Sequence, residues 1–343
     1  MAAKQRIAWI DIARGIGIIL VVFGHVLIGL SFSHADVREG FLAAVDYTIY
    51  TFHMPLFFVL AGLNVVHSLL KSPRRFLQDK LWTIAYPYVL WSLIQGSIQV
   101  LLPHMINTPH AAKSLAFILW RPIGQFWFLY ALFSCHFLAF LCKGRRWALT
   151  LCAGAGLLSL HWISNGLVVA VAIMFPFYVV GVWTSSLLLN WRPTQRTGFF
   201  STLGLTGALL LCAHVGRGPA NDQPYALPSL PAGIAGILLI IALSHLLHSL
   251  SASLSGKLVS LGQASFTIYV LHVLAGAATR VALSHLGLSS LWTQLLLGTA
   301  AGVLIPFVFH LALQRVDLLA PLGLAPLRKP PGPGVDEQAA LLA

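Results

Sequence analysis

The chain has 343 residues, of which 58% are hydrophobic and only 9% are charged, and its mean hydropathy is +0.83. So apolar a composition excludes an ordinary water-soluble domain and predicts an all-α, polytopic integral membrane protein. The formal net charge of +12 comes from basic residues in short connections between apolar runs, which indicates membrane topology rather than a nucleic-acid-binding face.

Apolar runs of membrane-spanning length recur along the whole chain and predict about ten helices. The run at 148–162 is short, and residues 114–125 can instead form an interfacial or re-entrant piece. We expect a single membrane domain over residues 1–325 and a disordered, Pro/Gly-rich cytoplasmic tail over 326–343. The predicted helices cover residues 7–31, 41–70, 81–102, 124–142, 148–162, 166–189, 198–215, 230–248, 263–284 and 291–314.

The charges of the connections predict which side of the membrane each one faces. Every second connection is rich in Lys and Arg, whereas the intervening ones carry only Arg38, Lys113, Arg121 and Arg217. By the positive-inside rule, the basic connections lie in the cytoplasm. With an even number of spans, both termini are then cytoplasmic as well.

The cysteines carry no functional signal. All four lie inside apolar runs rather than in paired loop positions, so neither a disulfide framework nor a metal site is expected.

The first apolar run, RIAWIDIARGIGIILVVFGHVLIGL (residues 6–30), contains Asp11, Arg14 and His25. On a helix, Arg14 and His25 point within about 20° of one another and lie about 16 Å apart along the axis, with Asp11 one turn before Arg14. A lone charge at mid-bilayer costs roughly 2.5 to 3.5 kcal/mol, so this stripe is expected to face a polar interior. The structural alternative is that Asp11 and Arg14 neutralise one another near the inner interface while His25 lies at the outer one.

Four stretches, in this order, resemble acyltransferase family 3 membrane proteins: DIARGIGIILVVFGH, FHMPLFFVLAG (52–62), GQFWFLYALF (124–133) and LGQASFTIYVLH (261–272). The FHMPLFF form is most similar to the branch with fucose 4-O-acetylase and related acetyltransferases. The resemblance implies a multi-pass enzyme of the bacterial inner membrane. Such an enzyme takes an acyl group, commonly acetyl, from cytoplasmic acyl-CoA (acetyl-CoA) and places it on a hydroxyl of an extracytoplasmic or lipid-linked sugar or polysaccharide.

Two residues of the first run are the candidate catalytic pair. The family's helix-one arginine and histidine fall on Arg14 and His25. His25 is expected to act as the general base, because imidazole exchanges a proton near neutral pH, or to carry the acyl group covalently. Arg14 is expected to bind CoA or to polarise its path, with Asp11 beside it in the substrate-binding set.

Four further residues are candidates for substrate binding. Pro55 has no N–H group, so the Thr51 carbonyl oxygen beside His53 loses its helical hydrogen bond. Such a carbonyl and an imidazole are tolerable inside a membrane where both line a cavity. Arg75 and Lys80 can hold the CoA phosphates or can serve only to set topology. Trp127 can stack on a sugar or adenine ring or can anchor the helix at the interface. By contrast, His272 is expected to be a hydrogen-bonded core histidine.

A secondary transporter or glycan flippase, with Asp11, Arg14 and His25 as a proton relay, is the main alternative. Such folds usually contain paired halves with matching broken helices, and the sequence shows no such symmetry.

Overall fold

The computed structural model describes residues 7–102, 112–218 and 223–326, and the regular elements within these ranges are helices. In the described residues, eight helices are long and apolar enough to cross a membrane. The predicted all-α, polytopic architecture is confirmed. The helices are α1 (Ala8–Leu30), α2 (Gly40–Leu69), α3 (Pro73–Lys80), α4 (Tyr86–Leu101), α5 (Trp127–Leu141), α6 (Arg146–Ser159), α7 (Gly166–Asn190), α8 (Gln195–Gly216), α9 (Leu230–Leu250), α10 (Ala252–His285) and α11 (Leu291–Arg315).

Two of the predicted spans form shorter helices. The 148–162 run becomes α6, whose 14 residues reach about 21 Å, less than the roughly 30 Å of a hydrocarbon core. The 81–102 run becomes α4, which a π-helical turn at Leu81–Ala85 joins directly to α3. The 114–125 stretch forms two 3₁₀ turns, Ala112–Phe117 and Gly124–Phe126. The number of spans and the sidedness of the termini stay predictions, and the predicted tail lies, apart from Pro326, outside the described residues.

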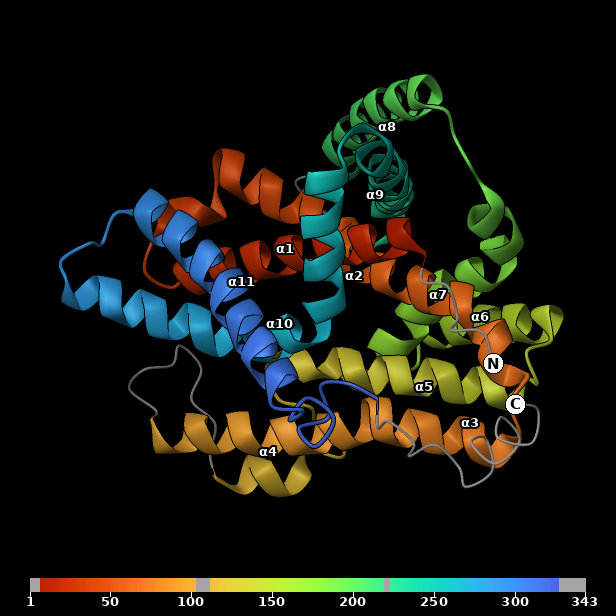
Figure 1. Cartoon of the computed structure of the whole chain (residues 1–343), viewed down its shortest axis with the longest axis horizontal. Helices are drawn as coiled ribbons and strands as arrows, with labels where there is room; N and C mark the ends of the chain where they lie inside the picture. The colour runs from red at the N-terminus through yellow and green to blue at the C-terminus, as the bar shows by residue number, and fades with distance from the viewer. Residues whose placement is uncertain (1–6, 103–111, 219–222, 327–343) are drawn as a thin grey trace, which may run out of the picture.

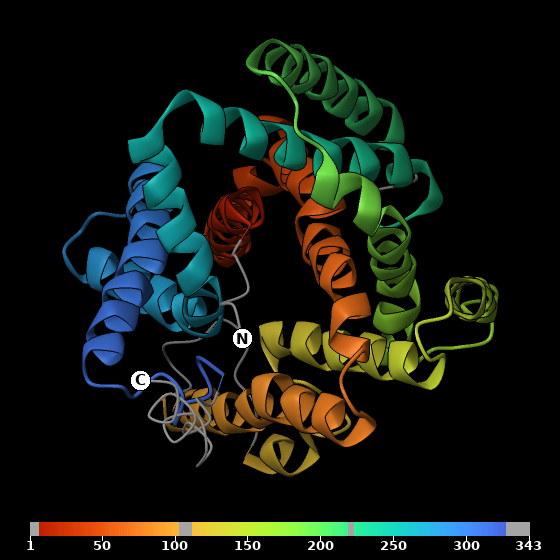
Figure 2. The same cartoon turned by 45° about the vertical axis from the view of Figure 1, so that its right-hand side comes forward.

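The candidate catalytic helix α1 lies in the middle of the molecule. It packs against α2, α9, α10 and α11, which surround it in both views (Figures 1 and 2). Helix α8 packs on α9, and α6 packs on α7 at the periphery. Large exposed leucines such as Leu203, Leu210 and Leu211 cover α8, as expected for a helix that faces lipid.

Glycines allow the most intimate helix contacts. A methyl group on Gly262 of α10 would overlap the Asp11 carbonyl oxygen, and one on Gly15 of α1 would overlap the Leu258 carbonyl oxygen. The two backbones therefore touch directly at the level of the ionisable stripe. Small residues are the usual means of such close packing in membranes, where lipid is as apolar as a leucine side chain.

We expect Gly262→Ala to destabilise the protein by about 1 to 3 kcal/mol, because the obstructing atom is backbone and cannot rotate away. The apparent midpoint of thermal unfolding in detergent measures the effect. Gly207→Ala on α8 is the matched control, since a methyl group there meets nothing within 4 Å. Equal midpoints for both variants would contradict the close α1–α10 packing.

Candidate functional site

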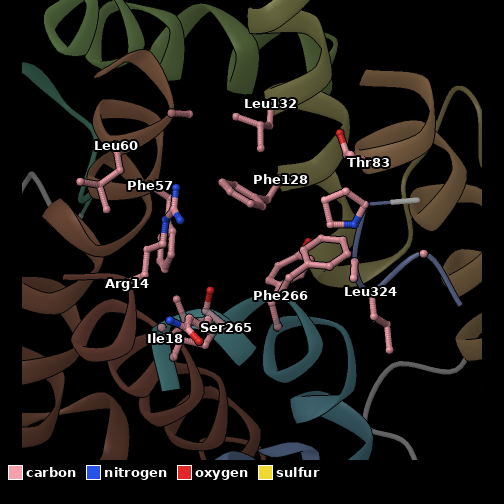
Figure 3. A pocket seen from close by; sticks show the side chains of 18 of the residues that line it. Arg14, Ile18, Phe57, Leu60, Thr83, Phe128, Leu132, Ser265, Phe266 and Leu324 are labelled. Atoms are coloured by element: carbon pink, nitrogen blue, oxygen red, sulfur yellow. The ribbon is translucent and has the colours of Figure 1, made fainter. Parts of the chain in front are cut away.

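A first cavity, of about 330 Å³, contains Arg14 in its wall. Side chains from α1, α2, α5 and α10 line this Arg14 cavity, and most of them are apolar. Among the described residues of the lining, Arg14 is the one that is charged, and Thr83, Gln263 and Ser265 add polar groups. Figure 3 shows Arg14 on one side of the cavity, with Thr83 and Leu324 on the opposite side. The described lining is therefore mostly apolar and contains one cation.

The predicted ion pair of the first helix forms. Arg14 Nη1 lies 3.4 Å from Asp11 Oδ1. The Arg14 side chain is 37% exposed, whereas that of Asp11 is only 9% exposed and lines none of the described cavities. Asp11 therefore holds the guanidinium from behind, and Arg14 presents its side chain to the cavity.

A segment that follows α11, residues 319–326, closes one side of the Arg14 cavity. Tyr86 Oη donates to the Pro321 carbonyl oxygen over 2.6 Å, and Trp91 Nε1 donates to the Leu322 carbonyl oxygen over 2.9 Å. Leu324 is buried and lines the cavity. Two side chains of α4 thus fix the end of the described chain against the site.

A second cavity, of about 360 Å³, contains His25. This His25 cavity lies between α1, α10 and α11 and the facing ends of α4 and α5. Of the predicted site residues, the structure brings His25 and Trp127 together here. Polar side chains that the sequence did not indicate complete the wall: Gln99, Gln125, His272, Arg280 and Gln294.

His272 lies directly against His25, with 5.0 Å between the ring centroids. Its Nδ1 donates to the Tyr269 carbonyl oxygen over 2.7 Å, as expected for a hydrogen-bonded core histidine. That bond fixes the tautomer, so Nε2 carries the lone pair. Nε2 is buried and has no hydrogen-bond partner among the described residues.

A second buried acceptor lines the same cavity. Gln99 Oε1 also has no hydrogen-bond partner in the described part of the chain. Buried polar atoms are rarely left without partners. Two acceptors in one cavity wall, His272 Nε2 and Gln99 Oε1, indicate a ligand that supplies hydrogen-bond donors.

His53 is a buried neighbour of His25, close enough for an electrostatic interaction, but it lines none of the described cavities. Its Nδ1 donates to the Ile49 carbonyl oxygen over 2.8 Å, and its ring meets Tyr50 edge-on. The Thr51 carbonyl freed by Pro55 faces Gly233 of α9 rather than a cavity. In the described residues, no three His, Cys, Asp or Glu side chains are arranged to hold a metal ion.

An aromatic layer lies between the two cavities. Phe128 and Tyr269 line the Arg14 cavity, and the neighbouring Trp127 and His272 line the His25 cavity. The Phe128 and Tyr269 rings pack edge-on with 5.4 Å between centroids, and Tyr269 Oη donates to the Gln125 carbonyl oxygen over 2.6 Å. Any ligand group that passes from one cavity to the other has to cross this layer.

The remaining candidates, Arg75 and Lys80, lie on α3 outside both cavities. Arg75 is exposed. Lys80 lies over the Phe76 ring, and its Nζ is 3.4 Å from His136 Nε2. Burial lowers the pKa of Lys80 to about 8, with a further lowering from Lys71 and an opposing effect of Asp79. Thr83, one turn beyond Lys80, lines the Arg14 cavity.

A family model described as an acyltransferase domain, of acyltransferase family 3, matches residues 7–311. The chain belongs to this family. The match spans both cavities, so Arg14 and His25 lie within the family domain. The eight candidate spans of the described residues agree with a multi-pass membrane member of acyltransferase family 3.

Two curated relatives are similar to the chain over part of their length. Nodulation protein NolL of Sinorhizobium fredii is 28% identical over 185 residues, which cover 52% of this chain and 49% of the relative. Nodulation protein NolL of Mesorhizobium japonicum is 30% identical over 126 residues, or 36% of this chain and 32% of the relative. The alignments thus span half or less of these relatives. No solved structure matches the chain, and the fucose 4-O-acetylase branch stays a prediction.

Proposed function

We propose that the chain transfers an acyl group, in particular acetyl, from cytoplasmic acyl-CoA to a hydroxyl of an extracytoplasmic or lipid-linked sugar or polysaccharide in the bacterial inner membrane. The observation that carries the proposal is the pair of unpartnered acceptors beside His25, His272 Nε2 and Gln99 Oε1. Sugar hydroxyls are donors that satisfy such atoms. Trp127 offers an aromatic face and Gln294 an amide to the same ligand.

The Arg14 cavity fits the donor. A mostly apolar cavity of about 330 Å³ suits a pantetheine arm, and one guanidinium suits a phosphate or the thioester oxygen. Arg14 and His25 lie about 16 Å apart along α1. The donor arm would therefore extend from the Arg14 cavity past Phe128 and Tyr269 to bring the thioester to His25.

Acyl transfer at His25 needs one proton acceptor and one proton donor. As the sugar oxygen attacks the thioester carbonyl, its proton passes to His25, and the C–S bond breaks to release the CoA thiolate, which takes the proton back. His272 Nε2 is placed to accept a hydrogen bond from the same hydroxyl or from the His25 ring. In the covalent route, a ring nitrogen of His25 attacks the thioester carbonyl, the C–S bond breaks, and the CoA thiolate takes the proton of the other ring nitrogen. The sugar hydroxyl then attacks the acyl-imidazole, and the C–N bond breaks as the ring takes the hydroxyl proton.

Isotope transfer tests the proposal. Full-length protein in lipid nanodiscs is supplied with acetyl-CoA labelled in the acetyl group, and the release of CoA and the formation of labelled glycan are measured. In a second experiment, envelope glycans from cells with and without the gene are compared by mass spectrometry. We expect a mass shift of one acyl group that depends on the protein. Transport of an intact glycan without CoA release would instead support the proton-relay transporter.

The pKa of Lys80 gives a test of the CoA-phosphate role proposed for Arg75 and Lys80. Because this pKa is lowered to about 8, Lys80 is cationic at pH 7 and largely neutral at pH 9. We expect the KM for acetyl-CoA to rise over this pH range in the wild type, and to be high and nearly flat in Lys80→Met. Initial rates at varied acetyl-CoA measure it.

The control is Lys257→Gln, which removes an exposed positive charge from α10. Its KM should follow the wild-type pH profile. A wild-type KM that does not change between pH 7 and pH 9, with Arg75→Gln also unaltered, would return both residues to a topological role.

A further inference from the structure

A third cavity, of about 400 Å³, adjoins the His25 cavity. We name it the His34 cavity, and residues after α1, the end of α10 and the start of α11 form its wall. Arg280 and Gln294 line both cavities. These two side chains therefore form the boundary between the two spaces, and each is within reach of a ligand in either cavity.

The shared boundary carries a fixed positive charge. Arg280 is half-buried, and its Nη1 donates to the Gly29 carbonyl oxygen over 3.0 Å, which orients the guanidinium. A guanidinium presents its five N–H donors in a planar fork. This geometry is the one that binds carboxylate and phosphate oxygens in pairs.

The surrounding wall favours the same sign of ligand. His34, His285, Ser33 and Ser289 line the His34 cavity, and no Asp or Glu is in the described lining of either cavity. The Ser33 hydroxyl donates to the Leu30 carbonyl oxygen, so the Ser289 hydroxyl and the imidazole N–H groups are the donors of this wall suited to an anion's oxygens. If Arg280 were only an anchor at the membrane interface, it would not need to lie between a cavity lined by hydrogen-bond donors and the cavity that contains His25.

The spacing to the catalytic centre is set by α10. Arg280 follows His272 by eight residues, which corresponds to about 12 Å along the helix axis. We infer that the acyl acceptor is anionic, and that Arg280 binds its phosphate or carboxylate while a hydroxyl of the same molecule lies at His25. This inference rests on the proposed function. A phosphate would belong to a lipid-linked or phosphate-linked sugar, and a carboxylate to an acidic sugar.

Ligand binding without acyl donor tests the anion site separately from acyl transfer. Full-length protein in nanodiscs is titrated calorimetrically with glucose 1-phosphate, glucuronate and glucose. We expect at least one charged sugar to bind about tenfold or more tightly than glucose, because an ionised partner strengthens a hydrogen bond by more than about 1.4 kcal/mol. Preference for glucose 1-phosphate identifies a phosphate acceptor, and preference for glucuronate identifies a carboxylate acceptor.

Arg280→Gln should remove this preference and leave the weak binding of glucose unchanged. Arg280→Lys, which keeps the charge and loses the fork, should retain part of the preference and shows whether the position tolerates change. The control Arg315→Gln removes an exposed positive charge from α11 and should bind like the wild type.

Equal affinity for all three sugars in the wild type, or a preference that persists in Arg280→Gln, would overturn the inference. An anion preference that depends on Arg280 in a protein that transfers no acyl group would instead contradict the proposed function and leave the anion site standing.

Discussion

Replacing His25 with alanine is expected to leave the protein folded and inserted while acyl transfer falls by roughly a hundredfold or more. His25 lines a cavity, and its side chain makes no hydrogen bond with the described part of the chain that the fold would lose. The variant removes either the proton acceptor or the acyl carrier. Labelled acetate transferred per minute in nanodiscs measures the loss, and the apparent unfolding midpoint confirms that the fold survives.

His214→Ala is the matched control, since His214 is exposed on α8, far from α1 in sequence and on the lipid-facing helix. It should keep wild-type activity. Added imidazole should restore part of the activity of His25→Ala if the ring acts as a base, because the emptied space lies in a cavity wall. Full activity in His25→Ala would exclude both routes proposed for this residue.

Arg14→Lys is expected to reduce acyl transfer nearly as severely as removal of the side chain. Lysine keeps the charge and can still pair with Asp11, but it loses the planar fork that binds phosphate or thioester oxygen in a bidentate way. Because a donor contact is at stake, the KM for acetyl-CoA should rise together with a fall in kcat/KM. Arg196→Lys, an exposed arginine before the lipid-facing part of α8, is the control and should be neutral.

The double variant Asp11→Ala with Arg14→Ala separates binding from packing. Removing both members of a structural pair can be nearly neutral for folding. We therefore expect a stable double variant with very low acyl transfer. Near-normal transfer by this variant would reduce Asp11 and Arg14 to a mutually neutralising pair in the membrane.

The sequence predicted the helices and the stripe on α1 because both follow from one periodicity. Arg14 and His25 share a face of a regular helix, and charged groups in an apolar run can only face an interior. The placement of these two residues in separate cavities was not predictable in this way. This placement depends on the packing of Phe128 against Tyr269. In the sequence, these two aromatic residues have the same spacing and surroundings as ordinary core residues.

The partners of His25 were missed for a different reason. His272 and Arg280 lie more than two hundred residues from His25, and their position follows from how α10 packs on α1. A lone histidine in an apolar helix has the same sequence signature whether it faces a core or a cavity. Only the unpartnered Nε2 of His272 distinguishes the two, and it is visible in three dimensions alone.

The contact of backbone on backbone at Gly15 and Gly262 has a consequence for how substrates enter and leave. Two helices separated by long side chains can slide as rotamers change, whereas helices that touch through their main chains cannot shift without lifting apart. We therefore expect α1 and α10 to move together as a rigid body, which keeps the relative position of His25 and His272 constant during the reaction cycle. Opening of the Arg14 cavity is then expected to involve its other walls, α2, α5 and the segment 319–326. The hydrogen bonds of this segment to Tyr86 and Trp91 can break without disturbing the catalytic pair.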